Sequence, residues 1–115
     1  MKTLKNCIKL GSQIKIFVPS TYNVCVPMDS NVWVDKSLNL LSACFGGATS
    51  TKALGAWISN TGDLVKENVT LVFAYAKEQD LEESIETIYD FCMDMKREMK
   101  QEAIALEVNG NLYFV

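Results

Sequence analysis

The side chains that could bind an anion are concentrated near the end of the long polar segment around residue 97. Arg97 is the only arginine of the chain, and Lys96 and Lys100 lie close to it in sequence. A guanidinium can hold a phosphate through two parallel hydrogen bonds, which makes these three residues a candidate phosphate site. They also fall in the last turns of an expected helix, where cations stabilise the helix dipole. The sequence leaves both roles open.

Two aromatic and two hydroxyl side chains could contact the remainder of such a ligand. Phe73 and Tyr75 fall on one face of an expected strand, where a nucleobase could stack on either ring. Thr49 and Thr51 follow a glycine pair and could donate hydrogen bonds. Each set also has a plainer interpretation, because strand aromatics commonly pack in a core and hydroxyl-rich segments commonly form loops.

The stretch FGGATSTKALGAWIS, residues 45–59, invites comparison with a phosphate-binding loop. A P-loop needs a glycine directly before its lysine and lies between a strand and the helix that follows. Here the order is reversed, since the glycines follow an expected helix and precede an expected strand, and Lys52 has no glycine before it. We interpret Gly46 and Gly47 as the end of a helix and residues 49–51 as a connecting loop.

The residue types that enzymes use most often are absent or scattered. The chain has no histidine, and its four cysteines form no C-x-x-C pair. These facts exclude the usual zinc patterns and cysteine–histidine catalysis. The acidic residues from Asp80 to Glu86 crowd the start of an expected helix, where a solvated, dipole-matched face explains them. The sequence therefore predicts no catalytic residue, no metal and no cofactor, and we expect that the protein is not an enzyme.

Hydrophobic periodicity predicts the elements that carry these residues. Apolar residues alternate along 14–18 and 68–76, as in strands, and Asn109-Gly110 is typical of a type I′ hairpin turn. Apolar residues recur every three or four positions after Asp29 and again after Asp80, as in helices. The predicted order is strand, helix, two strands, helix, two strands. This order indicates an α+β fold of ferredoxin-like flavour, with two helices packed on a mainly antiparallel sheet.

Length and charge restrict the classes of protein and partner. We expect residues 1–115 to form one domain, with 1–11 as an extended or poorly ordered N-terminal segment. The formal net charge of −3 disfavours long nucleic acids as partners.

No apolar run is long enough to span a membrane. Unpaired cysteines are typical of proteins in the reducing cytoplasm, which is where we expect this protein. If both helices cover one sheet face, the other face is left for a second copy of the chain.

The sequence resembles small proteins of low-GC Gram-positive bacteria and their prophages, and among characterised proteins the first-described phage anti-Thoeris family. The resemblance extends over nearly the whole chain from Lys15. It is carried by the segments IFVPSTYN, FGGATSTKALGAWIS, GDLVKENVTLVFAY and KQEAIALEVNGNLYFV. It implies a protein in the cytoplasm of an infected bacterial cell that binds a cyclic ADP-ribose isomer, made by a TIR-domain enzyme, without cleaving it. Some relatives also bind cyclic oligonucleotides.

The resemblance also implies a homo-oligomer, a dimer or larger, with pockets between subunits. An aromatic residue, Phe73 or Tyr75, would stack on adenine, and Arg97 would hold the diphosphate with help from Lys96 or Lys100. Two other interpretations stay open. The chain could be a phage inhibitor that binds a host protein through its acidic surface, or a small dimeric α+β enzyme.

Overall fold

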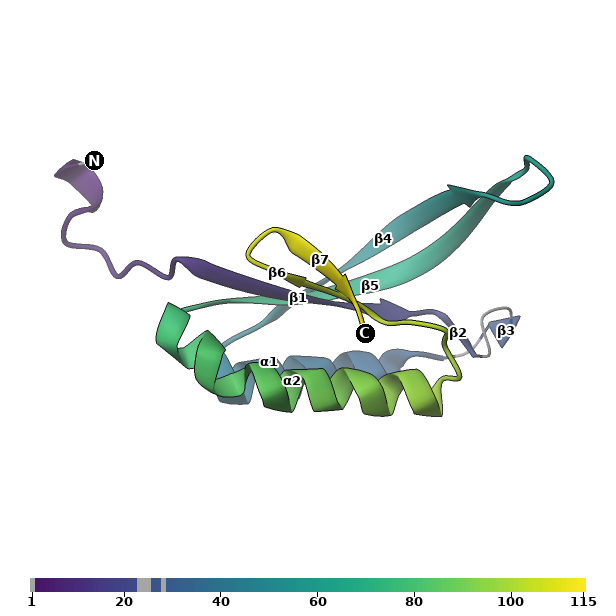
Figure 1. The fold of residues 1–115 in the computed structure, drawn as a ribbon. Helices are drawn as coiled ribbons and strands as arrows, with labels where there is room; N and C mark the ends of the chain where they lie inside the picture. The colour runs from purple at the N-terminus through teal and green to yellow at the C-terminus, as the bar shows by residue number, and fades with distance from the viewer. Residues whose placement is uncertain (1, 23–25, 28) are drawn as a thin grey trace.

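The chain folds into a five-stranded sheet with two long helices on one face (Figure 1). The computed structural model describes residues 2–22, 26–27 and 29–115, so Cys25 lies outside the described residues. The main elements are β1 (Ser12–Pro19), α1 (Asn31–Phe45), β4 (Thr49–Ile58), β5 (Leu64–Ala76), α2 (Glu78–Glu98), β6 (Ala105–Val108) and β7 (Asn111–Phe114). A short 3-10 helix (Lys2–Leu4) precedes them, and β2 (Thr21–Tyr22) pairs with β3 (Val26–Pro27).

The strand order in the sheet is β4-β5-β1-β6-β7, and every neighbouring pair is antiparallel. The α+β class, with two helices packed on an antiparallel sheet, is therefore confirmed. Within the described ranges, neither helix has the length and apolar character that a membrane crossing requires.

The core lies between the sheet and the helices. In β1 the residues Ile14, Ile16 and Val18 are completely buried, and the alternating residues point to the other face. This is the pattern of a strand with one covered face, because successive side chains point to opposite sides. The helix α2 contributes the buried stripe Leu81, Ile88, Cys92 and Met95.

The helix α1 ends at its glycine pair, as the sequence predicts. Gly46 has a φ of 89°, and its N–H donates a hydrogen bond of 2.8 Å to the carbonyl of Ser42. Glycine adopts this left-handed conformation without a steric cost, so the chain can leave the helix at once. Similarly, Asn109 and Gly110 have φ values of 51° and 84°, the two positive angles that a type I′ turn requires.

The interpretation of residues 49–51 as a connecting loop is wrong, because they are the first residues of β4. Thr49 pairs with Phe73 and Thr51 pairs with Leu71. Threonine is β-branched and fits a pleated strand, and the long strand β5 supplies backbone partners for the whole segment. The two threonine side chains therefore lie on the same sheet face as Phe73.

No described helix covers that second face (Figure 1). Along β5, Val72, Ala74 and Ala76 are buried against the helices, whereas Phe73 and Tyr75 point the opposite way. We call this second side of the sheet the open face. The prediction that the helices cover one face and leave the aromatic face uncovered is confirmed; occupation of the open face by a second copy stays a prediction.

The β4–β5 hairpin projects beyond the body of the molecule (Figure 1). Its distal half carries large apolar side chains that its own chain leaves exposed, among them Trp57 at 46% and Ile58 at 65%. Its turn is held by local bonds, such as that from the Ser59 N–H to the Asp63 carbonyl. Exposed apolar residues on a projecting hairpin are typical of a surface that contacts another molecule.

Candidate functional site

A pocket at the edge of β5, beside the start of β4, brings together three of the residues predicted to bind ligand: Thr49, Phe73 and Tyr75. We call it the aromatic pocket. It has a volume of about 420 Å³, and its walls come from the last residue of α1, the glycine turn after it, the first residue of β4, the end of β5 and Leu10. The pocket exists because β4 begins directly after the glycine turn, which places Thr49 beside the rings of β5.

The two rings of the aromatic pocket are held edge to face. The centroids of Phe73 and Tyr75 are 6.3 Å apart, and the ring planes meet at 89°. This arrangement is favourable for aromatic pairs, because the positive edge of one ring meets the negative face of the other. Tyr75 is 53% exposed, whereas Phe73 is half-buried. A planar ligand therefore has one accessible ring to stack on and one ring to pack against.

Lys15 is a cation of this region that the sequence reasoning did not include. It lies opposite Phe73 in the sheet, and its Nζ is 5.9 Å from the centre of that ring. The same Nζ is 3.6 Å from the Glu107 carboxylate on the other neighbouring strand. The signal was present in the alternation of β1, which places Lys15 on the face away from Ile14 and Ile16. The open face thus carries a cation and an anion beside the aromatic pocket.

The predicted phosphate-binding residues lie at the far end of α2 from the aromatic pocket. Arg97 comes twenty residues after Lys77, the N-cap of α2, which corresponds to about 30 Å at about 1.5 Å per residue. Arg97 is exposed and donates a hydrogen bond to the Asp94 carboxylate on its own helix. Lys100 follows the helix with a φ of 50°. Within one chain, these cations and the aromatic rings do not form a single site.

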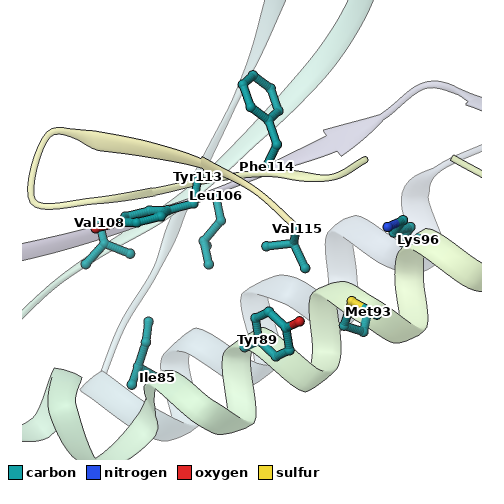
Figure 2. Close-up of a pocket in the computed structure, with 9 residues that line it drawn as sticks. All are labelled: Ile85, Tyr89, Met93, Lys96, Leu106, Val108, Tyr113, Phe114 and Val115. Atoms are coloured by element: carbon teal, nitrogen blue, oxygen red, sulfur yellow. The ribbon is translucent and has the colours of Figure 1, made fainter. Parts of the chain in front are cut away.

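Two predicted residues remain to be placed. Thr51 lies on the open face opposite Leu71, outside the lining of the aromatic pocket. Lys96 lines a different cavity, a groove of about 440 Å³ between α2 and the C-terminal hairpin, which we call the C-terminal groove (Figure 2). Sequence reasoning missed this groove, since it depends on how β7 lies against α2.

Buried Cys92 is unsuited to nucleophilic chemistry. Its side chain is completely buried on the inner stripe of α2, and burial raises the pKa of the thiol from 9.0 to about 12. The reactive form of cysteine is the thiolate, which is therefore scarce at neutral pH. Across the described part of the chain, no three His, Cys, Asp or Glu side chains converge to hold a metal ion.

Comparisons with known proteins identify neighbours by fold. No protein-family model and no curated protein sequence matches the chain. A structure of phage SAM lyase in complex with S-methyl-5'-thioadenosine superposes with a TM-score of 0.66 at 14% identity, covering 97% of this chain and 94% of that one. The apo state of phage SAM lyase gives a TM-score of 0.59 at 17% identity, with 91% and 88% covered.

A third neighbour is a Bacillus cereus protein related to NIF3, with a TM-score of 0.51 at 12% identity. The match covers 90% of this chain but 25% of that protein. At these identities the likeness concerns the fold alone.

The expectation that the chain is not an enzyme is contradicted by these neighbours, because phage SAM lyase is an enzyme with the same fold. The expectation rested on the absence of histidine and of a nucleophile motif. That reasoning was too narrow in physical terms, since carboxylates, lysines and tyrosines also transfer protons. Tyr75, Lys15 and Glu107 are such groups on the open face.

Proposed function

We propose that the chain is a phage anti-defence protein that binds an adenosine-containing small molecule in the aromatic pocket. The observation that carries the proposal is the edge-to-face pair of Phe73 and Tyr75, with Thr49 opposite, in a pocket of about 420 Å³. Two facts support it: the fold is that of a phage SAM lyase, one structure of which contains S-methyl-5'-thioadenosine, and the sequence resembles phage anti-Thoeris proteins.

The chemistry of an adenosine suits these side chains. Adenine is planar, and stacking of a base on an aromatic ring contributes about 1–3 kcal/mol. The Thr49 hydroxyl can donate to or accept from a ribose hydroxyl or a ring nitrogen. The pocket lies within the usual size range of small-molecule sites, about 300–1,000 Å³, at about 420 Å³.

The resemblance makes a cyclic ADP-ribose isomer the first anionic ligand to test. Its diphosphate needs cations, and Lys15 is already paired with Glu107. Arg97 and Lys100 lie too far from the aromatic pocket of their own chain, so a second copy would supply them, and the exposed Arg97–Asp94 pair would open to free the guanidinium. The uncovered sheet face and exposed side chains such as Trp57 and Phe114 give such a copy an apolar surface to bury.

Calorimetry with the purified protein tests the proposal. S-methyl-5'-thioadenosine, SAM and a cyclic ADP-ribose isomer are titrated separately, and each ligand is recovered and examined by chromatography and mass spectrometry. At least one should bind. Recovery of an unchanged ligand supports sequestration, and recovery of a converted ligand supports catalysis. Failure of all three to bind at millimolar concentration contradicts the proposal.

The variant Tyr75→Leu tests the role of the pocket, because Tyr75 is the accessible ring. Loss of stacking worth about 1–3 kcal/mol raises Kd about 5- to 150-fold. The matched control is Tyr89→Leu, which removes an exposed aromatic ring of the C-terminal groove. It should leave Kd for the adenosine ligand unchanged. Equal effects of the two variants would show that the aromatic pocket is not the site.

Subunit mixing tests whether a second copy completes the site. If each site takes Tyr75 from one copy and Arg97 from the next, neither Tyr75→Leu nor Arg97→Ala binds the cyclic ADP-ribose isomer well. Random assembly of an equal mixture then restores about a quarter of the sites, whatever the number of subunits in a ring. Absence of any recovery, with mixing verified by native mass spectrometry, would contradict shared sites.

A further inference from the structure

The C-terminal groove is separate from the aromatic pocket and has its own construction. One wall comes from α2, with Ile85, Tyr89, Met93 and Lys96, and the other comes from β6 and β7 (Figure 2). The second wall is fixed by two backbone hydrogen bonds between Ile104 and Val115, of 3.1 and 2.8 Å. The groove is therefore held open between two rigid elements rather than formed by a loop.

The lining of the groove is apolar except at one end. Leu106, Val108 and Val115 provide aliphatic surface, and Met93 provides a thioether. Two tyrosine rings flank this surface, Tyr89 at 47% exposure and Tyr113 at 53%. Aromatic rings and a thioether sulfur both favour contact with a flat aromatic ligand over an aliphatic chain.

The polar end of the groove carries a single positive charge. Lys96 is half-buried, and within the described ranges no carboxylate lies within ion-pair distance of its ammonium group. Its neighbour Arg97, by contrast, is paired with Asp94. An ammonium group beside an apolar cavity favours one anionic group on the ligand, because a charge-assisted hydrogen bond is stronger where water is partly excluded.

We propose that the C-terminal groove is a second ligand site, which binds a small aromatic carboxylate. The ring system lies against Tyr89 and Tyr113, and the carboxylate accepts a hydrogen bond from the Lys96 Nζ. The volume of about 440 Å³ accommodates a fused two-ring ligand. This site is independent of the proposed function, since it shares no residue with the aromatic pocket.

Naphthalene-2-carboxylate is the probe, and its neutral amide, naphthalene-2-carboxamide, is the matched ligand. Calorimetry with the full chain should show that the acid binds about tenfold more tightly than the amide, as expected for one charge-assisted hydrogen bond at a half-buried site. Lys96→Met, which keeps the apolar stem, should remove this preference and leave the affinity for the amide unchanged. Lys52→Met removes an exposed lysine of β4 and should change neither affinity.

Equal affinity of acid and amide for the unmodified chain would overturn the proposal, and so would an unchanged preference in Lys96→Met. Circular dichroism verifies that each variant is folded. Met93→Glu supplies an independent test, because a carboxylate in the groove should abolish binding of the acid. If the groove is instead covered by a second copy, the probe does not bind, and Met93→Glu lowers the mass of the assembly by sedimentation. That result overturns the ligand site.

Discussion

Raising the pH above 9 should destabilise the fold through the buried thiol of Cys92. The thiol is completely buried, and burial raises its pKa from 9.0 to about 12. Between these values the unfolded chain loses the thiol proton while the folded chain keeps it. Stability from this residue is therefore fully present below pH 9 and is lost as the pH rises towards 12. At pH 11 the loss reaches about 3 kcal/mol, since each tenfold change in ionisation corresponds to about 1.4 kcal/mol.

Urea denaturation at several pH values from 8 to 11 measures this effect, with Cys92→Ala as the reference. The variant leaves a small cavity and should be about 1–2 kcal/mol less stable at pH 8. Because it has no thiol to ionise at this position, it escapes the alkaline loss, and the two stability curves should cross before pH 11. All other titrating groups are common to both proteins and cancel in the difference.

Parallel stability curves over this range would refute the reasoning, because they would mean that the Cys92 thiol ionises equally in the folded and unfolded chains. Thiol alkylation at pH 8 provides a second measurement. The exposed Cys7 should react rapidly with iodoacetamide, and Cys92 should react at the rate of unfolding. Rapid alkylation of Cys92 in the folded chain would make it a candidate nucleophile after all.

Two further predictions concern the elements that position the sites. Ile88 is completely buried in α2, so Ile88→Ala opens a cavity under the sheet. It should lower the free energy of unfolding, measured with urea, by about 2–5 kcal/mol. Val32→Ala, at an exposed position of α1, is the control and should lower it by about 0.5 kcal/mol or less. Gly110→Ala places a side chain at a φ of 84° in the C-terminal turn and should cost about 1–2 kcal/mol. The control is Gly47→Ala, because Gly47 has no positive φ and the added methyl group would meet open space.

The sequence predicted those parts of the fold in which local pattern and tertiary packing agree. The stripe of α2 and the alternation of β1 are long and regular, and both lie against the same core. The start of β4 was missed for two reasons. Only Gly47 and Ala48 separate Gly46, which ends the helix, from the strand. The hydroxyl residues 49–51 also lack the alternating apolar neighbours that indicate a strand, so they resemble a loop. Pairing with β5, a long-range interaction, decides the conformation of Thr49.

The sequence indicated which aromatic residues lie together, but not how far the predicted cations lie from them. Alternation along β5 placed Phe73 and Tyr75 on one face, and the structure puts Thr49 beside them. Their distance from Arg97 follows from the length of α2 and was accessible from the sequence, since the strand leads directly into the helix. The C-terminal groove was not accessible, because its two walls meet only when the hairpin after Ile104 packs against α2.

The charges on the open face distinguish between the two kinds of adenosine ligand. A sulfonium such as that of SAM is a cation, and it is attracted by the faces of aromatic rings such as Phe73 and Tyr75. The Glu107 carboxylate is already paired with Lys15. A diphosphate is an anion, and Lys15, which lies over the Phe73 ring, is already paired with Glu107. In the proposed site a sulfonium ligand would therefore be bound by one chain, whereas a diphosphate ligand would require Arg97 of a second copy. Recovery of binding on subunit mixing is accordingly expected for the cyclic ADP-ribose isomer, and Arg97→Ala alone should leave the affinity for SAM unchanged.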